Sequence, residues 1–250
     1  MTTTAQPGLE IRADLADSHA ATWRHIAGAG TWWTAEDRLA IAEEARLARD
    51  CGLCAERKAA MSPFAVDGEH ENAGRLPTAV IDVIHRVITD PGRLTQSWLS
   101  KVFAGGLEDT HYVELVAVAV FTHSLDIFQR ALGLDRVPLP VAAPGAAEPT
   151  RARPEIARPD GAWVDLVPDG EEGGSFARDV YGGMESVPYI GRALSLVPLE
   201  VAALRGLSGP HYMELSHVSD PHYETPGRAI DRLQMELVAA RVSLMNDCFY

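Results

Sequence analysis

Apolar residues recur through much of the chain at the spacing of one face of a helix. The segment TAEDRLAIAEEARLARD (34–50) begins with Thr34, a preferred helix N-cap, and carries acidic residues in its first turn. Its apolar residues Ile41, Ala45 and Ala48 fall on one face of that helix. The pattern therefore predicts an amphipathic helix.

Five later segments have the same character. They are LPTAVIDVIHRVITD (76–90), DPGRLTQSWLSKVFAGG (90–106), DTHYVELVAVAVFTHSLDIFQRALG (109–133), VPYIGRALSLVPLEVAALRGL (187–207) and RAIDRLQMELVAARVSL (228–244). The apolar positions of the third fit a helix or a strand over a few residues. Its length and its lack of internal Pro or Gly predict a buried helix.

Changes in composition divide the chain into four parts. These are a flexible tail (1–18), a first helical half (19–136), a Pro- and Gly-rich connector (137–184) and a second helical half (185–250). The connector is expected to lie extended on the surface. GLEDTHYVEL and GLSGPHYMEL resemble each other and lie 100 residues apart, which gives a weak repeat signal. We therefore expect an all-α protein with two related halves.

Charge and hydrophobicity narrow the classes of partner. The 250 residues are 46% hydrophobic and carry a net charge of −13, which repels phosphate backbones and disfavours nucleic-acid binding. Apolar runs fall short of the roughly 20 residues of a membrane helix. The N-terminal segment lacks a basic stretch followed by an apolar one, so we expect no secretory signal. We expect a cytoplasmic protein with reduced cysteines and no membrane contact.

The three cysteines are the main candidates for chemistry. Cys51 and Cys54 form a Cys-x-x-Cys pair, and Cys248 stands alone. Asp50 directly precedes Cys51 and Asp247 directly precedes Cys248 as possible helix caps, which would place Cys51 and Cys248 in a first helical turn, where the helix dipole lowers a thiol pKa. Two sulfurs three residues apart can form a disulfide. Two small buried hydrophobes and a metal site remain alternatives, but no second Cys/His pair has finger-like spacing.

Several titratable residues lie in apolar surroundings. Glu236 lies inside LQMELVAARVSL, where it is expected to be paired, protonated or functional, and Arg232 is available one turn earlier. Glu114 is expected to be buried, with a structural and a catalytic role both open. His85 and His123 fit hydrogen-bonded core histidines better than bases.

The segment QMELVAARVSLMNDCFY (234–250) resembles part of the active site of the alkylhydroperoxidase D-like, carboxymuconolactone decarboxylase superfamily. Redox members of this all-helical superfamily carry a Glu on one helix, a Cys-x-x-Cys on the next and a His four residues later. Glu236 lies twelve residues before Cys248, which is the family spacing. The resemblance implies that Glu236 joins a proton relay and that Cys248 is the first cysteine of a pair whose second member would be residue 251.

The first half departs from this pattern. Lys58 stands where the family has its His after the pair that begins at Cys51. Leu39 occupies the position twelve residues before Cys51, and the nearest acids are Glu43 and Glu44. The segment 83–134 also resembles a subgroup of alkylhydroperoxidase-related proteins, some of which are selenoproteins.

The resemblance implies an alkylhydroperoxidase D-like bundle of two halves, the second incomplete. It implies a thiol- or selenol-dependent peroxidase that reduces hydroperoxides with Cys51, Cys54, Cys248 and Glu236 as site residues. It further implies a thioredoxin-like or other dithiol reductant, a homo-oligomer, no bound cofactor and no resident metal. A UGA selenocysteine codon after Tyr250 is one expectation, and apolar surface left exposed on neighbouring helices is another.

Three other functions stay open. A decarboxylase-like enzyme of the same superfamily would act on a small lactone by acid–base chemistry and would not need the cysteines. A non-catalytic helical interaction protein would show no reactive thiol. A metal site joining the cysteines to a histidine would bind zinc stoichiometrically.

Overall fold

The protein is all-helical, as the sequence predicts. The computed structural model describes residues 10–144, 148–214, 217, 218, 220–225, 227–246 and 248. In that part of the chain 57% of the structure is helix and there is no strand. The one β-type contact in these residues is an isolated bridge between Arg158 and Leu166.

Most of the helices overlap the predicted helical segments, whereas one of them, Gly170–Tyr181, lies in the predicted connector. In chain order they are α1 (Ala13–Ile26), α2 (Ala35–Ala48), α3 (Gly52–Ala59), α4 (Thr78–Thr89), α5 (Gln96–Ala104), α6 (Asp109–Ala131), α7 (Gly170–Tyr181), α8 (Tyr189–Arg192), α9 (Pro198–His211) and α10 (Arg232–Met245). Short 3-10 turns, η1 (Pro63–Ala65) and η2 (Pro91–Arg93), precede α4 and α5. Thr34 caps α2 as predicted, since its hydroxyl accepts from the Asp37 N–H in a capping box.

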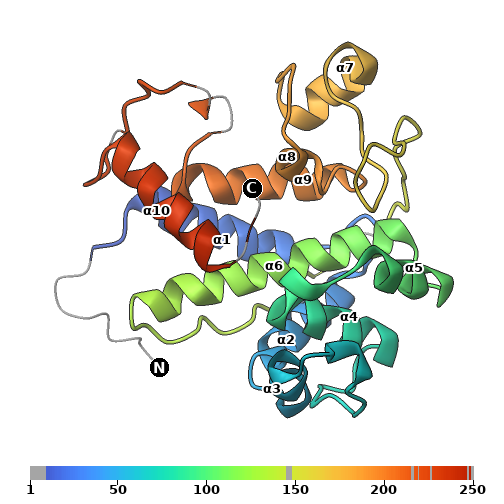
Figure 1. Ribbon diagram of the computed structural model, residues 1–250. Helices are drawn as coiled ribbons and strands as arrows, with labels where there is room; N and C mark the ends of the chain where they lie inside the picture. Colours follow the sequence, from blue (N-terminus) through green and yellow to red (C-terminus); the bar gives the residue numbers. More distant parts are fainter. Residues whose placement is uncertain are drawn as a thin grey trace.

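The long helix α6 is the centre of the molecule. In Figure 1, α2, α3 and α4 lie below α6, whereas α9 lies above it, alongside α1. The main core draws apolar side chains from both groups, including Ile41 of α2, Ile84 of α4, Phe121 of α6 and Leu207 of α9. Helix α9, from the predicted second half, therefore shares a core with the first half.

Helix α6 is long and apolar enough to cross a membrane by length and composition alone. Its most apolar window has a mean hydropathy of 1.2, and 56% of that window is buried inside the protein. Such burial is typical of the central helix of a globular protein, and the finding carries no further conclusion about location.

A buried ion cluster joins three helices across this core. The Arg38 guanidinium of α2 donates to Glu114 of α6 at 2.5 Å and to Glu200 of α9 at 2.7 Å, and all three side chains are fully buried. Glu114 also accepts from the Trp32 N–H at 2.8 Å. Glu114 is therefore buried, as predicted, and its partners hold helices together.

Two boundary predictions are wrong. Helix α1 begins at Ala13 and buries Ser18, so the predicted tail is too long. Helix α7 lies inside the segment predicted as an extended connector. Its residues Ala177, Val180 and Tyr181 are buried in a small cluster with Val201 of α9, and this burial outweighs the helix-breaking composition.

Helix α10 packs least tightly of the long helices. Among its described residues only Met235 is buried. Large apolar side chains face solvent, namely Leu233, Leu237, Val238, Val242, Leu244 and Met245.

Candidate functional site

Helix α3 brings Cys51 and Cys54 together. Cys51 is the N-cap of α3 and Cys54 lies in its first turn, so the two sulfurs point to one side. Both residues are buried, with exposed fractions of 2% and 4%. The prediction that Asp50 caps this helix is wrong, because the carboxylate of Glu71 accepts the Gly52 N–H at 3.0 Å instead. The matching expectation for Asp247 lies outside the described residues.

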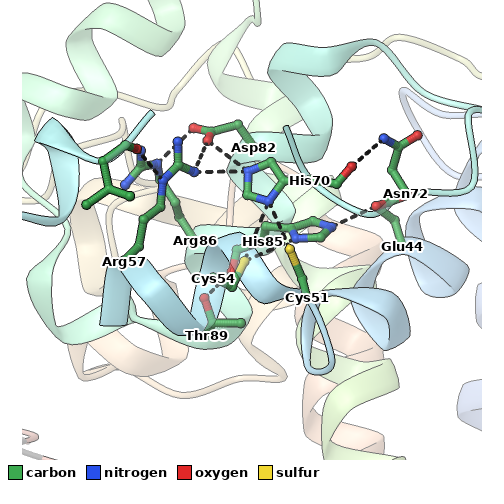
Figure 2. Close-up of polar contacts among 11 residues, drawn as sticks. Glu44, Cys51, Cys54, Arg57, His70, Asn72, Asp82, His85, Arg86 and Thr89 are labelled. Carbon is green, nitrogen blue, oxygen red and sulfur yellow. Dashed lines mark hydrogen bonds and ion pairs between the residues drawn. The ribbon is translucent and has the colours of Figure 1, made fainter. Parts of the chain in front are cut away.

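His85 of α4 approaches the cysteine pair from one side. Its Nδ1 lies 3.2 Å from Cys54 Sγ, and its Nε2 lies 2.7 Å from Oε1 of Glu44 on α2. A carboxylate can only accept, so Nε2 carries the proton and the Nδ1 lone pair faces the thiol. Cys54, His85 and Glu44 thus form a buried thiol–imidazole–carboxylate chain (Figure 2).

His70 approaches the same sulfurs from the loop after α3. Its Nδ1 lies 3.5 Å from Cys51 Sγ and 3.6 Å from Cys54 Sγ. Its Nε2 lies 3.1 Å from Oδ1 of Asp82 and 3.0 Å from the Arg57 guanidinium. Figure 2 shows both imidazoles above the two sulfurs, each with a carboxylate on its outer side.

Short polar contacts fix the loop that carries His70. Arg57 of α3 donates through Nε to the Val66 carbonyl at 3.1 Å and through its guanidinium to Asp82 at 2.7 Å. The backbone also passes close to α3 at Gly68, where a Cβ would lie 2.8 Å from a methyl of Leu53. A residue with a side chain at position 68 would have to displace the Leu53 side chain or shift the loop.

The carboxylate behind His70, Asp82, is held in its ionised form by its neighbours. Burial acts to raise the pKa of Asp82, but hydrogen bonds from His70, Arg86 and Arg57 outweigh it and hold this pKa well below its usual range. Asp82 is therefore ionised beside His70. The side chains of Arg57 and Arg86 compensate its charge from either side.

The pKa of the Cys54 thiol is shifted in the opposite direction, upward. Burial raises the pKa of Cys54 to about 12, despite a favourable contact with Thr89. Burial also lowers the pKa of His85, despite its hydrogen bond to Glu44. The sequence predicted a lowered thiol pKa for Cys51 and Cys248, which directly follow the proposed caps, and not for Cys54, where desolvation sets the direction of the shift. The resting pair is a neutral thiol beside a neutral imidazole.

A pocket of about 470 Å³ reaches the cysteine pair from solvent. It is lined by Arg49, Cys51, Cys54, Ala55, Lys58, Ile88, Thr89, Pro91, His123, Ile127 and Asn246. These residues come from the end of α2, from α3 and its N-cap, from the end of α4, from η2, from α6 and from the C-cap of α10. A larger hollow of about 600 Å³ beside Trp163 has neither cysteine nor histidine in its lining.

The other predicted site residues lie on or after α10. Glu236 is partly exposed and pairs with Arg232 at 2.7 Å, and it accepts from the Tyr212 hydroxyl at 2.5 Å. The surface pair that the sequence offered for Glu236 is therefore present. Cys248 is exposed, and its N–H donates to the Ser243 carbonyl at 2.9 Å.

Sequence reasoning did not assemble most of this site. It named Glu44 only as one of the acids nearest to the position twelve residues before Cys51, and it favoured a core role for His85. It gave no role to His70, Asp82 or Arg57. The sequence did hold one signal for this site. Two histidines follow the Cys-x-x-Cys pair within 31 residues, and two cysteines with two histidines can make a set of four metal ligands.

Comparison with models of known protein families, with curated proteins and with solved structures gives no match to this chain.

Proposed function

We propose that the protein is a thiol-dependent peroxidase that reduces hydroperoxides at Cys51 and Cys54. The observation that carries this proposal is a dithiol in the lining of a pocket, with His85 Nδ1 3.2 Å from Cys54 Sγ and Glu44 behind the imidazole. Cys54 would be the nucleophile, His85 the base and Glu44 the carboxylate that orients the base. This arrangement activates a weakly acidic nucleophile.

The buried thiol requires a partner base. A thiol with a pKa near 12 has little free thiolate at neutral pH, so Cys54 reacts only as its proton passes to His85. The Cys54 sulfur then attacks the terminal oxygen of the hydroperoxide and the O–O bond breaks. The proton on His85 passes to the departing alkoxide. The products are Cys54 sulfenic acid and an alcohol.

Cys51 completes the cycle. Its sulfur attacks the sulfenic sulfur of Cys54, a disulfide forms and the sulfenic oxygen leaves as water. A dithiol reductant of the thioredoxin type then exchanges with this disulfide and restores both thiols. The pocket supports a small organic hydroperoxide, because Ile88 and Ile127 give it apolar walls while Lys58 and Thr89 supply polar groups.

We place the reaction on Cys51 and Cys54 rather than on Glu236 and Cys248. Glu236 is held by Arg232 and Tyr212, and it lies about 14 Å along the helix axis from Met245, the last residue of α10. Glu44 takes the role that the resemblance gave to Glu236.

The test is oxidation of the metal-free, reduced protein by one equivalent of cumene hydroperoxide. We expect a Cys51–Cys54 disulfide by peptide mass spectrometry, and steady peroxide consumption when a dithiol is supplied. Cys54→Ser should abolish consumption. Cys51→Ser should stop at a sulfenic acid on Cys54, which dimedone traps.

The matched control is Cys248→Ser, which should react like the wild type. Peroxide consumption that survives replacement of both Cys51 and Cys54, or that disappears in Cys248→Ser alone, would contradict the proposal. Lactone turnover in a protein without cysteines would favour the acid–base alternative.

A further inference from the structure

We propose that Cys51, Cys54, His70 and His85 also form a binding site for one zinc ion. This inference goes beyond the peroxidase and does not depend on it. The sulfur and nitrogen ligand atoms of the four residues all lie within 4.8 Å of one another.

The separations match those of a tetrahedral zinc site. Zn–S bonds of about 2.3 Å and Zn–N bonds of about 2.0–2.1 Å place sulfur and nitrogen ligands about 3.6 Å apart. Here the Nδ1 of His70 lies 3.5 Å and 3.6 Å from the two sulfurs, and the Nδ1 of His85 lies 3.2 Å from Cys54 Sγ. An ion at the centre needs only small adjustments of the side chains.

The outer atoms of both imidazoles supply an independent argument. Metal-binding histidines usually donate their second N–H to a carboxylate, which fixes the tautomer and orients the ring. His85 Nε2 lies 2.7 Å from Glu44. His70 Nε2 lies 3.1 Å from Oδ1 of Asp82, and the Arg57 guanidinium, 3.0 Å from the same nitrogen, donates to that oxygen as well. Each imidazole thus has a carboxylate beside its Nε2 and directs its Nδ1 toward the sulfurs.

Ligand type and charge select the metal. Two thiolates and two neutral imidazoles suit zinc, whereas magnesium and calcium prefer oxygen ligands. Two thiolates balance the charge of Zn²⁺, which matters because the four side chains are almost fully buried. Zinc binding requires both sulfurs as thiolates, so it and the Cys51–Cys54 disulfide are mutually exclusive states of one dithiol.

The direct test is metal binding by the reduced wild-type chain. After chelation and dialysis against Zn²⁺, we expect one zinc ion per chain by elemental analysis. Co²⁺ in place of Zn²⁺ should give the visible bands of a tetrahedral site and a sulfur-to-cobalt charge-transfer band. Failure to retain zinc, or cobalt bound without the charge-transfer band, would overturn the inference.

Variants locate the site. His70→Gln changes a loop residue, and it should weaken zinc binding more than about 100-fold while the circular dichroism stays that of the wild type. Asp82→Asn, which removes the carboxylate behind His70 together with the charge that pairs with Arg57 and Arg86, should weaken binding about 10- to 100-fold. His123→Gln is the control, since His123 lines the same pocket outside the ligand set. Equal affinity in His70→Gln and wild type would contradict the assignment.

The two proposals fail separately. A protein that forms the Cys51–Cys54 disulfide but binds no zinc supports the peroxidase and overturns the metal site. A protein that binds zinc but whose metal-free thiols resist peroxide supports the metal site and overturns the peroxidase.

Discussion

At the scale of single residues, the contact between Glu44 and His85 decides what the cysteine pair can do. Neither side chain reaches solvent. Glu44 accepts from His85 through Oε1 and from the Ala73 N–H through Oε2 at 3.2 Å, so one carboxylate orients the imidazole and ties down the loop that carries His70. Its charge also stabilises the imidazolium that forms when His85 takes the Cys54 proton.

We predict that Glu44→Gln slows disulfide formation by hydroperoxide about 10- to 100-fold. The amide keeps the shape of the side chain and loses the negative charge beside the imidazole. The measurement is the rate of thiol loss in the reduced, metal-free protein. Glu43→Gln is the matched control, because Glu43 is exposed and pairs with Arg75 on the surface. If the two variants react at the same rate, the charge of Glu44 has no part in the reaction.

At the scale of elements, Arg38 joins α2, α6 and α9. Its guanidinium lies between Glu114 and Glu200, and His25 of α1 contacts Glu200 at 2.8 Å. Burial raises the pKa of Glu114. Burial acts the same way on Glu200, but the hydrogen bond to His25 and the charge of Arg38 outweigh it and lower that pKa. The cluster is stable only while its central cation is present.

We predict that Arg38→Met lowers the free energy of unfolding by about 3–5 kcal/mol, because two buried carboxylates lose their shared partner. Urea denaturation followed by circular dichroism gives the value. Arg75→Met, in an exposed pair with Glu43, should change it by less than about 0.5 kcal/mol. A similar small change in Arg38→Met would show that the three helices pack without the cluster.

At the scale of the whole molecule, buried and half-buried histidines make the stability of the fold depend on pH. Burial lowers the pKa values of His19, His111 and His123 below the usual value of 6.5. Below that pH the unfolded chain binds protons that the folded chain does not. The stability that these neutral histidines allow is therefore fully present above pH 6.5, and it is lost as the pH falls toward their lowered pKa values in the folded protein.

We predict that the urea concentration at the unfolding midpoint of the chelator-treated protein decreases as the pH is lowered from about 7 to about 5. Carboxylates with lowered pKa values, such as Asp82, lose their contribution only at lower pH. Glu114 acts in the opposite sense, since its raised pKa favours the folded state at low pH. His19→Gln should reduce the slope by removing one of the buried titrating groups. A midpoint that is flat or rises toward pH 5 would refute this account.

The sequence by itself determined the elements and the position of the dithiol. Helix spacing and capping depend on residues within one or two turns, so the Thr34 cap, α4, α6 and the Cys51–Cys54 pair on one turn could all be predicted. The same local rules mistook α7 for connector, because its helix depends on burial against α9.

Only the tertiary structure decided which side chains surround the dithiol. His70 and His85 lie 16 and 31 residues after Cys54 and come from a loop and from another helix, so no period links them to the cysteines. Glu44 reaches His85 because α2 packs against α4. Burial decided the protonation of Cys54 as well, since desolvation depends on what covers the sulfur and not on its neighbours in sequence.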